Sequence, residues 1–464
     1  MKKLFTFFLI FALIFGLFAC ASSGGGEAKT DGSALEAGFG RIDINPTTPV
    51  GMGGYSDSET RKSGNILDNI YATCVAFREA EQTILIYTIE VCGLSDSVME
   101  GIRTRVSSAT GVPNENIFIG ATHTHSAPVV GDDVGWDTIF YNACISSAQL
   151  AISDLALIKM ETATVQLENM NFVRHYEMND GTYYGSNFGS TESGFKAHVA
   201  DPDKQLILVK LDREEKKDIL MINWQAHPAA AARQNDYTGV SADFVGHMRT
   251  KVEMETGMQV AYYNGASGNV NPRSLIESEN VNNNATYQDY GKTLGQFIID
   301  TIPSLAPVEG TGIKTTRTSF EAEIDHSWDH MVPKANEVYE LWKSEDKNKG
   351  DALGAEYGFT SVYQARAIRT RAALPATQVR ELRAFRVGPI GFTTGTYEMF
   401  CDHAMYVKEN SPFDVTFVIT GNSGYIPNVR AYEYRSYESD TGMFASGTGE
   451  KMAEEYVKLL EQVK

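Results

Sequence analysis

Short apolar segments of strand length alternate with segments of helical periodicity along most of this chain. Residues 83–92 form an apolar, β-branched run that is typical of a buried strand. Ser95 and Asp96 then open a pattern with apolar residues at helical spacing, and Gly111 ends it. Another apolar run, residues 117–119, follows directly. We therefore predict an α/β fold with central β-sheets and helices packed on the outer faces.

The same two patterns recur further along the chain. We predict strands at residues 205–211, 218–224, 259–263, 380–392 and 413–420, the first two joined by a charged hairpin at 212–217. We predict helices at residues 136–157, from Ser241 onward, at 286–302, and over a more polar stretch at 326–373 that contains an exposed turn at 343–350. No internal repeat is visible. Roughly 445 residues follow the predicted signal, more than one core usually holds, so one large domain or two fused subdomains are expected, and we predict a single large domain at residues 36–464.

The first twenty residues are typical of an export signal. Lys2 and Lys3 precede an apolar run, residues 4–18, which is shorter than a membrane-spanning helix. The run ends in Leu17-Phe18-Ala19-Cys20, which resembles the cleavage box of bacterial lipoproteins, whose cysteine is lipidated. A polar tract follows, which favours this interpretation over a core helix or a plain secretory signal. We predict a signal peptide at 1–19, a flexible tether at 20–35, and an exported protein of the cell envelope (outer membrane or cell surface) held at the membrane by a lipid anchor at Cys20.

The charge balance and the cysteines exclude two classes of function. The chain has 59 Asp and Glu against 40 Lys and Arg, a formal net charge of −19. Because an acidic surface repels a phosphate backbone, we exclude nucleic acid as a partner. The cysteines are widely spaced and form no CxxC pair, so we expect free thiols rather than disulfides or a cysteine metal site.

Two of the nine histidines stand one residue apart, as His123 and His125, just after the strand predicted at 117–119. Side chains two residues apart share one side of an extended backbone, so both imidazoles can point into one cleft. Imidazole is the commonest metal ligand in proteins and also serves as a general acid or base. The pair indicates a metal or catalytic site, with a solvated loop as the alternative.

Four further segments end an apolar strand in polar or small residues, as the histidine pair does. They are residues 223–228 with His227, residues 262–272 with Asn271, residues 391–398 with Glu398, and residues 421–427 with Tyr425, which Tyr437 follows twelve positions later. Each segment alone is typical of an ordinary turn. Ligands collect at strand ends in α/β sheets, however, so the five segments together predict one site.

These segments resemble the neutral (non-lysosomal) ceramidase family, which comprises zinc amidases that cut N-acyl bonds. The likeness is carried by Gly-Phe-Gly-Arg-Ile-Asp-Ile-Asn-Pro at 38–46, His-Thr-His-Ser-Ala-Pro at 123–128, Asn-Trp at 223–224 with His227, Ser-Ala-Asp at 241–243, Gly-Tyr-Ile-Pro at 424–427 and Tyr-Glu at 437–438. The resemblance implies that residues 36–464 form a zinc hydrolase domain of the ceramidase type.

The resemblance also implies a role for individual side chains. His123, His227, Glu398 and Tyr425 match the family's zinc ligands, and His125 and Tyr437 match residues that face the scissile amide. Arg174 matches a substrate-binding arginine in a looser alignment. On this resemblance Zn²⁺ activates a water molecule, His125 passes a proton to the leaving amine, and Tyr437 donates to the oxyanion. Two imidazoles and a carboxylate are an ordinary catalytic zinc set.

One departure from the family concerns Asn271. Family members carry Gly-Asp-x-Ser-Pro where residues 268–272 read Gly-Asn-Val-Asn-Pro. An asparagine cannot act as a hydroxyl nucleophile, although its amide can hydrogen-bond in the site. We therefore expect direct attack by zinc-activated water on the N-acyl bond of a lipid-like or N-acylated amine, in the manner of ceramidases acting on sphingolipids. The alternatives are a zinc esterase or lactonase on the same site, and a non-catalytic ligand-binding lipoprotein of the envelope.

Three further polar residues have weaker signals. Asp243 is predicted either to stand at the start of a helix or to orient His227. His326 and His330 share a helix face, but Ser327 follows His326, so they form no His-Glu-x-x-His zinc motif. We expect that pair to be exposed.

Overall fold

The computed structural model describes residues 34–55, 60–131, 133–184, 194–272, 286–344, 346–395, 397–421 and 424–464, all within one compact unit. The predicted signal peptide at 1–19 and nearly all of the predicted tether at 20–35 lie outside these ranges. Among the helices described, none combines the length and the apolar character that crossing a bilayer requires.

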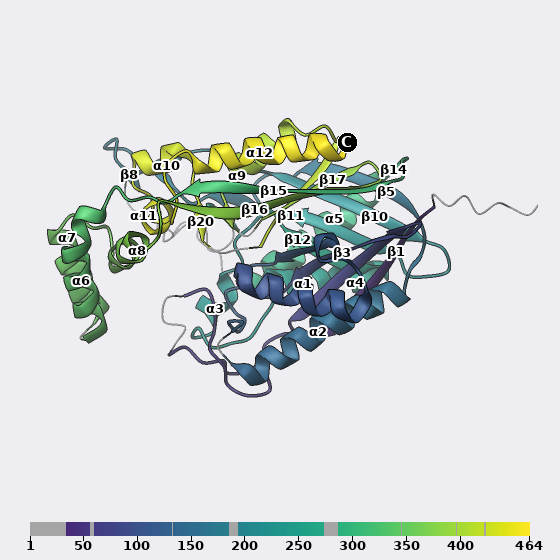
Figure 1. Cartoon of the computed structure of the whole chain (residues 1–464), viewed down its shortest axis with the longest axis horizontal. Coiled ribbons are helices and arrows are strands. Elements are labelled where there is room, and N and C mark those ends of the chain that lie inside the picture. Colours follow the sequence, from purple (N-terminus) through teal and green to yellow (C-terminus); the bar gives the residue numbers. More distant parts are fainter. Residues whose placement is uncertain are drawn as a thin grey trace, which may run out of the picture. The chain divides into compact units, whose positions relative to one another are not determined.

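Nine strands of the described residues form one large mixed sheet (Figure 1). Its order is β12-β11-β10-β5-β1-β2-β3-β4, with β14 beside β5. Only the pairs β11–β12 and β3–β4 are parallel within the described sheet. The strands are β1 (Leu35–Asp43), β2 (Tyr71–Glu79), β3 (Gln82–Ile89), β4 (Ile117–Ala121), β5 (Ala156–Gln166), β10 (Gln205–Arg213), β11 (Ile219–Trp224), β12 (Gln259–Asn264) and β14 (Ala306–Val308).

The two edges of this sheet approach each other where the predicted site residues lie. The side-chain amide of Asn264, the last residue of β12, donates to the backbone carbonyl of Thr122, just after β4, at 3.1 Å. Thr88 on β3 likewise donates to the backbone carbonyl of Tyr262 on β12. The loops that follow β4 and β11 are therefore neighbours although more than 100 residues separate His123 from His227.

A second sheet packs on one face of the first. It has the order β15-β16-β17-β19, with β15 (Ile313–Glu323), β16 (Thr377–Val387), β17 (Ile390–Gly395) and β19 (Val415–Thr420). The side chains between the sheets are apolar, and the ring of Phe118 lies 3.8 Å from that of Phe385, centroid to centroid. Phe385 in turn stacks on Phe392 at 4.6 Å. Face-to-face burial of this kind is what fixes one sheet upon another.

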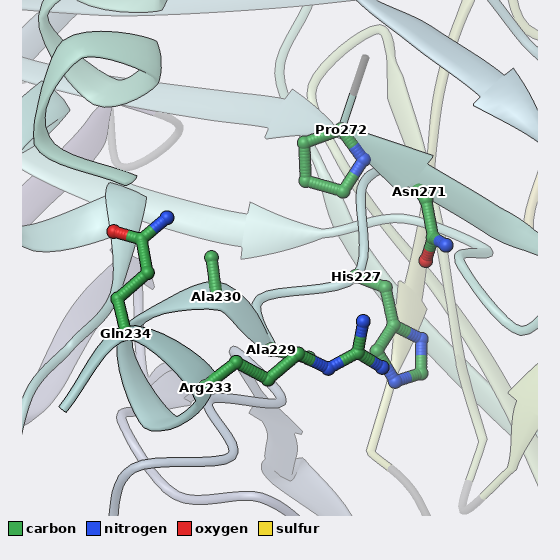
Figure 2. Close-up of a pocket in the computed structure, with 7 residues that line it drawn as sticks. All are labelled: His227, Ala229, Ala230, Arg233, Gln234, Asn271 and Pro272. Carbon is green, nitrogen blue, oxygen red and sulfur yellow. The ribbon is translucent and has the colours of Figure 1, made fainter. Parts of the chain in front are cut away.

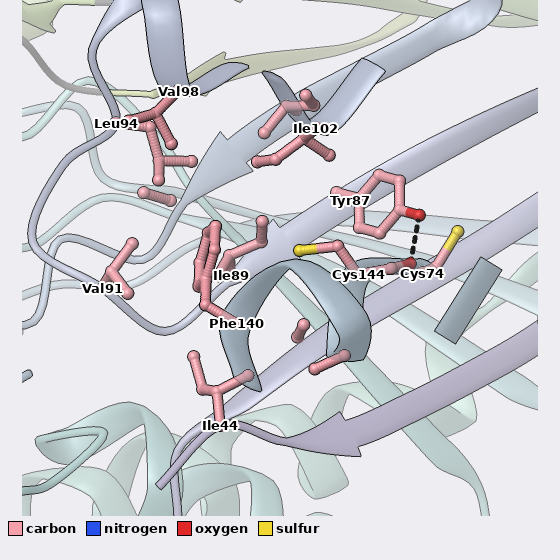
Figure 3. Close-up of a cluster of buried hydrophobic side chains, with 14 of the residues drawn as sticks. Ile44, Cys74, Tyr87, Ile89, Val91, Leu94, Val98, Ile102, Phe140 and Cys144 are labelled. Atoms are coloured by element: carbon pink, nitrogen blue, oxygen red, sulfur yellow. Dashed lines mark hydrogen bonds between the residues drawn. The ribbon is translucent and has the colours of Figure 1, made fainter. Parts of the chain in front are cut away.

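Helices cover the two outer faces, so the described unit has four layers (Figure 1). On the large sheet lie α1 (Asp96–Thr110), α2 (Val134–Ser153), α4 (Phe244–Thr256) and α5 (Tyr287–Thr301), and on the second sheet lie α9 (Cys401–Glu409) and α12 (Thr448–Val463). Figure 3 shows the layer under α2, where the Tyr87 hydroxyl donates to the Cys144 carbonyl at 2.7 Å. The predicted α/β architecture is confirmed, and Cys74, Cys144 and Cys401 are free thiols, as predicted.

Several boundaries differ from the prediction, and the following differences are the clearest. The strand predicted at 380–392 is a hairpin, because Gly388 takes a positive φ of 54° between β16 and β17. Part of the turn predicted at 343–350 belongs to α7 (Lys347–Glu356). The helix predicted at 136–157 ends at Ser153, and β5 begins at Ala156.

The polar stretch at 326–373 forms a helical lobe with a small apolar core of its own. The lobe contains α6 (Val332–Ser344), α7 and α8 (Val362–Ala372). The remaining short elements are β6 (Asn171–Val173), β7 (Tyr176–Met178), β8 (Tyr183–Tyr184), β9 (Phe195–His198), α3 (Ala230–Gln234), β13 (Val270–Pro272), β18 (Glu398–Met399), β20 (Tyr425–Ile426), α10 (Val429–Glu433), α11 (Tyr437–Thr441), and the 3₁₀ turns Asn114–Asn116, Ile302–Ser304 and Asp329–Met331.

Candidate metal centre

His123 and His125 lie in the loop that follows β4, but not on an extended backbone. His123 has a φ of +70°, in the left-handed region. The prediction that the two side chains share one side of an extended backbone is therefore wrong. The turn is fixed by backbone hydrogen bonds from His123 to the carbonyl of Val91 (3.1 Å) and from His125 to the carbonyl of Pro228 (2.9 Å). The two Nε2 atoms nevertheless lie only 3.2 Å apart, so both imidazoles point to one place, as predicted.

His227, in the loop after β11, completes a cluster of three buried imidazoles. Its Nε2 lies 3.0 Å from that of His123 and 2.9 Å from that of His125. The Nδ1 atoms of His123 and His227 face the backbone carbonyls of Cys92 (2.7 Å) and Ser267 (3.2 Å). Because a carbonyl only accepts, both Nδ1 atoms carry a proton, so Nε2 is the atom through which each of these two rings can bind a metal.

The second sheet supplies a carboxylate to the same point. Glu398 Oε2 lies 3.2 Å from His123 Nε2 and has no hydrogen-bond partner among the described residues. Tyr425 stands directly opposite Glu398, because β18 and β20 pair in parallel with these two residues in register. The sequence signal at 391–398 and that at 421–427 thus reach one place through a two-residue strand pair.

The donor set fits a zinc ion. One ligand atom each from His123, His227 and Glu398 lies within 4.8 Å of the other two. The Nε2 atoms of His123 and His227 are so close that a proton or a cation must lie between them, and the Glu398 carboxylate brings a negative charge to the same place. Cys92 was not predicted here, yet its Sγ lies 3.8 Å from His123 Nδ1 and forms a second possible grouping with His123 and His125.

Burial sets the protonation of these groups. It lowers the pKa of His125 and of His227 well below the usual value for histidine, and the charge on His123 acts in the same direction. Burial also disfavours the charged form of His123, but the Glu398 carboxylate overrides this and raises the pKa of His123 well above its usual value. His125 and His227 are therefore neutral near pH 7, as a ligand or a base must be.

Arg174, Asn271 and Tyr437 border the same centre on its other side. The Arg174 guanidinium donates to the Tyr425 hydroxyl at 3.3 Å and to Asn271 Oδ1 at 3.4 Å. The Tyr437 ring lies 6.0 Å from that of Tyr425, and burial raises the pKa of Tyr437 to about 12, so its hydroxyl stays a donor. All eight predicted site residues therefore lie around one centre.

Two buried residues beside Arg174 were not predicted. Glu438 accepts from Arg174 Nε at 2.8 Å and from His175 Nε2 at 2.8 Å. Glu438 follows Tyr437 directly, and His175 follows Arg174. The Tyr-Glu motif was noted in the sequence, but no spacing indicated that its carboxylate meets Arg174 rather than a metal.

Asp243, His326 and His330 lie outside the cluster of imidazoles. Asp243 caps α4, its two carboxylate oxygens accepting from the backbone N–H groups of Phe244 and Ala231 at 2.7 Å each. This confirms the first of its two predicted roles, while the Nδ1 atom of His227 faces Ser267 instead. His326 pairs with Asp329 at 2.9 Å, and His330 is exposed, as expected.

A small cavity of about 140 Å³ adjoins the centre on the side of His227 (Figure 2). Asn271 and Pro272 enter it from β13, and Arg233 and Gln234 from α3. Its lining combines polar side chains, among them the Arg233 guanidinium, with the apolar Ala229, Ala230 and Pro272. The cavity gives a polar group beside the centre room to bind.

Known proteins share this fold. A family model described as "Neutral/alkaline non-lysosomal ceramidase, N-terminal" matches residues 35–274. The structure is similar to that of neutral ceramidase from Pseudomonas aeruginosa, with a TM-score of 0.67 at 16% identity over 93% of this chain and 75% of that one. It is also similar to a ceramidase complexed with C2, with a TM-score of 0.64 at 15% identity over 92% of this chain and 75% of that one.

Proposed function

This chain belongs to the neutral/alkaline non-lysosomal ceramidase family, and we propose that it is a zinc-dependent hydrolase that cleaves the N-acyl bond of a lipid-like or N-acylated amine. Membership of the family and the shared fold make it a ceramidase-like hydrolase. The observation that carries the finer proposal is the convergence of two imidazole Nε2 atoms and the Glu398 carboxylate in one buried place.

His123, His227, Glu398 and Tyr425 are the residues that would hold the zinc ion. A bound zinc ion supplies an activated water molecule and polarises the carbonyl of the substrate. The hydrogen bonds from Nδ1 to the carbonyls of Cys92 and Ser267 keep the first two imidazoles turned toward the centre. Direct contact of Tyr425 with the ion is part of the proposal, supported by its place opposite Glu398.

The remaining residues perform the proton transfers and hold the substrate. His125 is buried and neutral, so it can take a proton from the attacking water and give it to the leaving amine. Tyr437 keeps its proton and donates to the oxygen that becomes negative in the transition state. Asn271 lacks a hydroxyl, so its part is a hydrogen bond beside His227 rather than covalent attack.

The test is metal content and turnover of a fluorogenic N-lauroyl amide for the wild type and for His123→Ala. We expect stoichiometric zinc in the wild type. In the variant we expect zinc to be lost and turnover to fall by about a thousandfold or more. His330→Ala, which removes an exposed imidazole, is the matched control and should change neither quantity. A matched ester measured in parallel separates an amidase from an esterase. Wild-type protein that hydrolyses the amide without zinc would contradict the proposal.

A further inference from the structure

Glu438 is a fully buried carboxylate next to the candidate centre, and the proposed reaction assigns it no role. Its Oε1 accepts from Arg174 Nε at 2.8 Å and lies 2.7 Å from Arg174 Nη2. Its Oε2 accepts from His175 Nε2 at 2.8 Å. The side chains of Arg174 and Glu438 are 0% exposed. Removing a charge from water to this extent is energetically unfavourable, so a buried carboxylate in this position calls for a reason.

Arg174 contacts one of the proposed ligands, Tyr425, directly. Its Nη2 lies 3.3 Å from the Tyr425 hydroxyl, and its guanidinium carbon lies 5.7 Å from the centre of the Tyr425 ring. Tyr425 is in register with Glu398. Arg174 therefore contacts the residue that stands opposite Glu398 in the strand pair.

A guanidinium in this position creates a problem for a metal site. It repels a divalent cation, and the repulsion is strong where little water screens it. It also offers Glu398 an alternative partner, since a carboxylate and an arginine form paired, charge-assisted hydrogen bonds. An arginine left without its own carboxylate here would compete with zinc for Glu398.

We propose that Glu438 is a positioning residue that neutralises Arg174 and holds it away from Glu398, so that an arginine and a zinc ion can share one buried site. Its second oxygen is held by His175, whose Nδ1 lies 2.7 Å from the Tyr434 hydroxyl. Glu438 is therefore tied on both sides and cannot turn toward the metal. Arg174 is left free to orient Tyr425 and Asn271 through its other N–H groups. This inference rests on the proposed zinc site.

The test measures zinc affinity by competition with a chelator of known affinity, independently of turnover. Glu438→Gln keeps the shape of the side chain and removes its charge, and we expect zinc to bind about tenfold more weakly or worse. Combining it with Arg174→Gln removes the competing cation, and affinity should return to within about threefold of the wild type. Turnover should stay low in the double variant, because Tyr425 and Asn271 lose the group that orients them.

The matched control is Asp154→Asn. Asp154 follows the last residue of α2 and forms an ion pair with another buried arginine, Arg213, so this change also removes the carboxylate partner of a buried guanidinium. It should lower the unfolding free energy without changing zinc affinity. A purely structural role of Glu438 predicts that the double variant binds zinc no better than Glu438→Gln, and that result would overturn the inference. Unchanged affinity in Glu438→Gln would overturn it too.

If Glu438→Gln does not fold, Arg174→Gln alone still tests the inference. In this variant the Glu438 carboxylate lacks its guanidinium partner, so zinc should bind as tightly as in the wild type or more tightly. Weaker binding overturns the inference. A wild type that binds no zinc would overturn the proposed function, and this inference with it. A wild type that binds zinc, with every variant at the same affinity, would overturn only the inference.

Discussion

His125 could serve the centre either as a third metal ligand or as a proton carrier, and the two roles can be told apart. Its Nε2 lies 3.2 Å from that of His123 and 2.9 Å from that of His227, as near as a third ligand would be. Its Nδ1, unlike theirs, has no hydrogen-bond partner in the described part of the chain. A ligating histidine is normally held through its second nitrogen, so this difference favours the role of a proton carrier.

His125→Gln is therefore expected to keep stoichiometric zinc while turnover falls by about 100- to 10,000-fold, the usual contribution of a general acid or base. Zinc content and the kcat of the N-lauroyl amide are the two readouts. Loss of zinc to the extent seen for His123→Ala would make His125 a ligand and would remove it from the proton transfers.

Glu438 gives a prediction about pH. Burial alone raises its pKa, but His175 and Arg174 lower it to about 2, below the ordinary value for glutamate. A depressed pKa stabilises the folded protein above the unfolded-state pKa, and this stabilisation is lost as the pH falls through the folded value. At pH 7 it contributes up to about 3 kcal/mol relative to Glu438→Gln.

The difference in unfolding free energy between the wild type and Glu438→Gln should therefore shrink as the pH falls from about 5 toward 2. Urea unfolding of both proteins in chelator, at several pH values, measures it without a contribution from zinc. A difference that stays constant over this range would show that the pKa of Glu438 is not lowered in the folded protein.

Side chains that end a strand could be predicted, and isolated buried ones could not. His123, His227 and Glu398 each close an apolar run, and the structure brings all three together. Tyr425 depended on the family resemblance, because a tyrosine in a turn is more often a packing residue. Nothing in the spacing of His175 or Cys92 marks them, since their contacts come from loops distant in sequence. The positive φ of His123 was equally hidden.

At the scale of elements, the two-residue pair of β18 and β20 positions half of the proposed ligands. Gly268, in the loop before β13, lies directly against it. A Cβ atom at Gly268 would stand 2.4 Å from the backbone oxygen of Glu398 and 2.9 Å from that of Met399. Because neither backbone atom can move aside cheaply, the loop needs glycine here to let β18 approach.

Gly268→Ala should therefore displace Glu398, lower the unfolding free energy by about 1–3 kcal/mol, and weaken zinc binding by about tenfold or more. The matched control is Gly354→Ala in α7, where the nearest heavy atom to the new Cβ lies at an ordinary 3.6 Å. That change should cost nothing or stabilise the helix by up to about 1 kcal/mol. Chelator competition and urea unfolding measure both, and equal effects at the two positions would contradict the argument.

Long periodic elements could be predicted well, and short or glycine-containing ones could not. Helix α1 was predicted together with its Ser95 cap and its Gly111 end, and the structure contains both. Strand β1 contains Gly38 and Gly40, which break its apolar pattern. The structure gives the reason, because a Cβ at either position would collide with the backbone of α2. Close packing of a helix on a strand thus erased the signal that would have revealed the strand.

At the scale of the whole molecule, the two sheets each supply part of the centre. His123, His125 and His227 come from loops after β4 and β11 of the large sheet, whereas Glu398 and Tyr425 follow β17 and β19 of the second sheet. The apolar layer around Phe118 and Phe385 fixes the position of one sheet relative to the other. The centre exists only when both sheets are packed together, which explains why no single segment of the sequence contains it.

If this centre binds zinc and hydrolyses an amide with it, turnover must depend on the metal. The most direct measurement is turnover of the fluorogenic N-lauroyl amide by one wild-type sample before chelation, after chelation, and after addition of one equivalent of zinc. We predict that turnover disappears with the metal and returns with the single equivalent. Turnover that continues at the original rate in metal-free protein would contradict the claim.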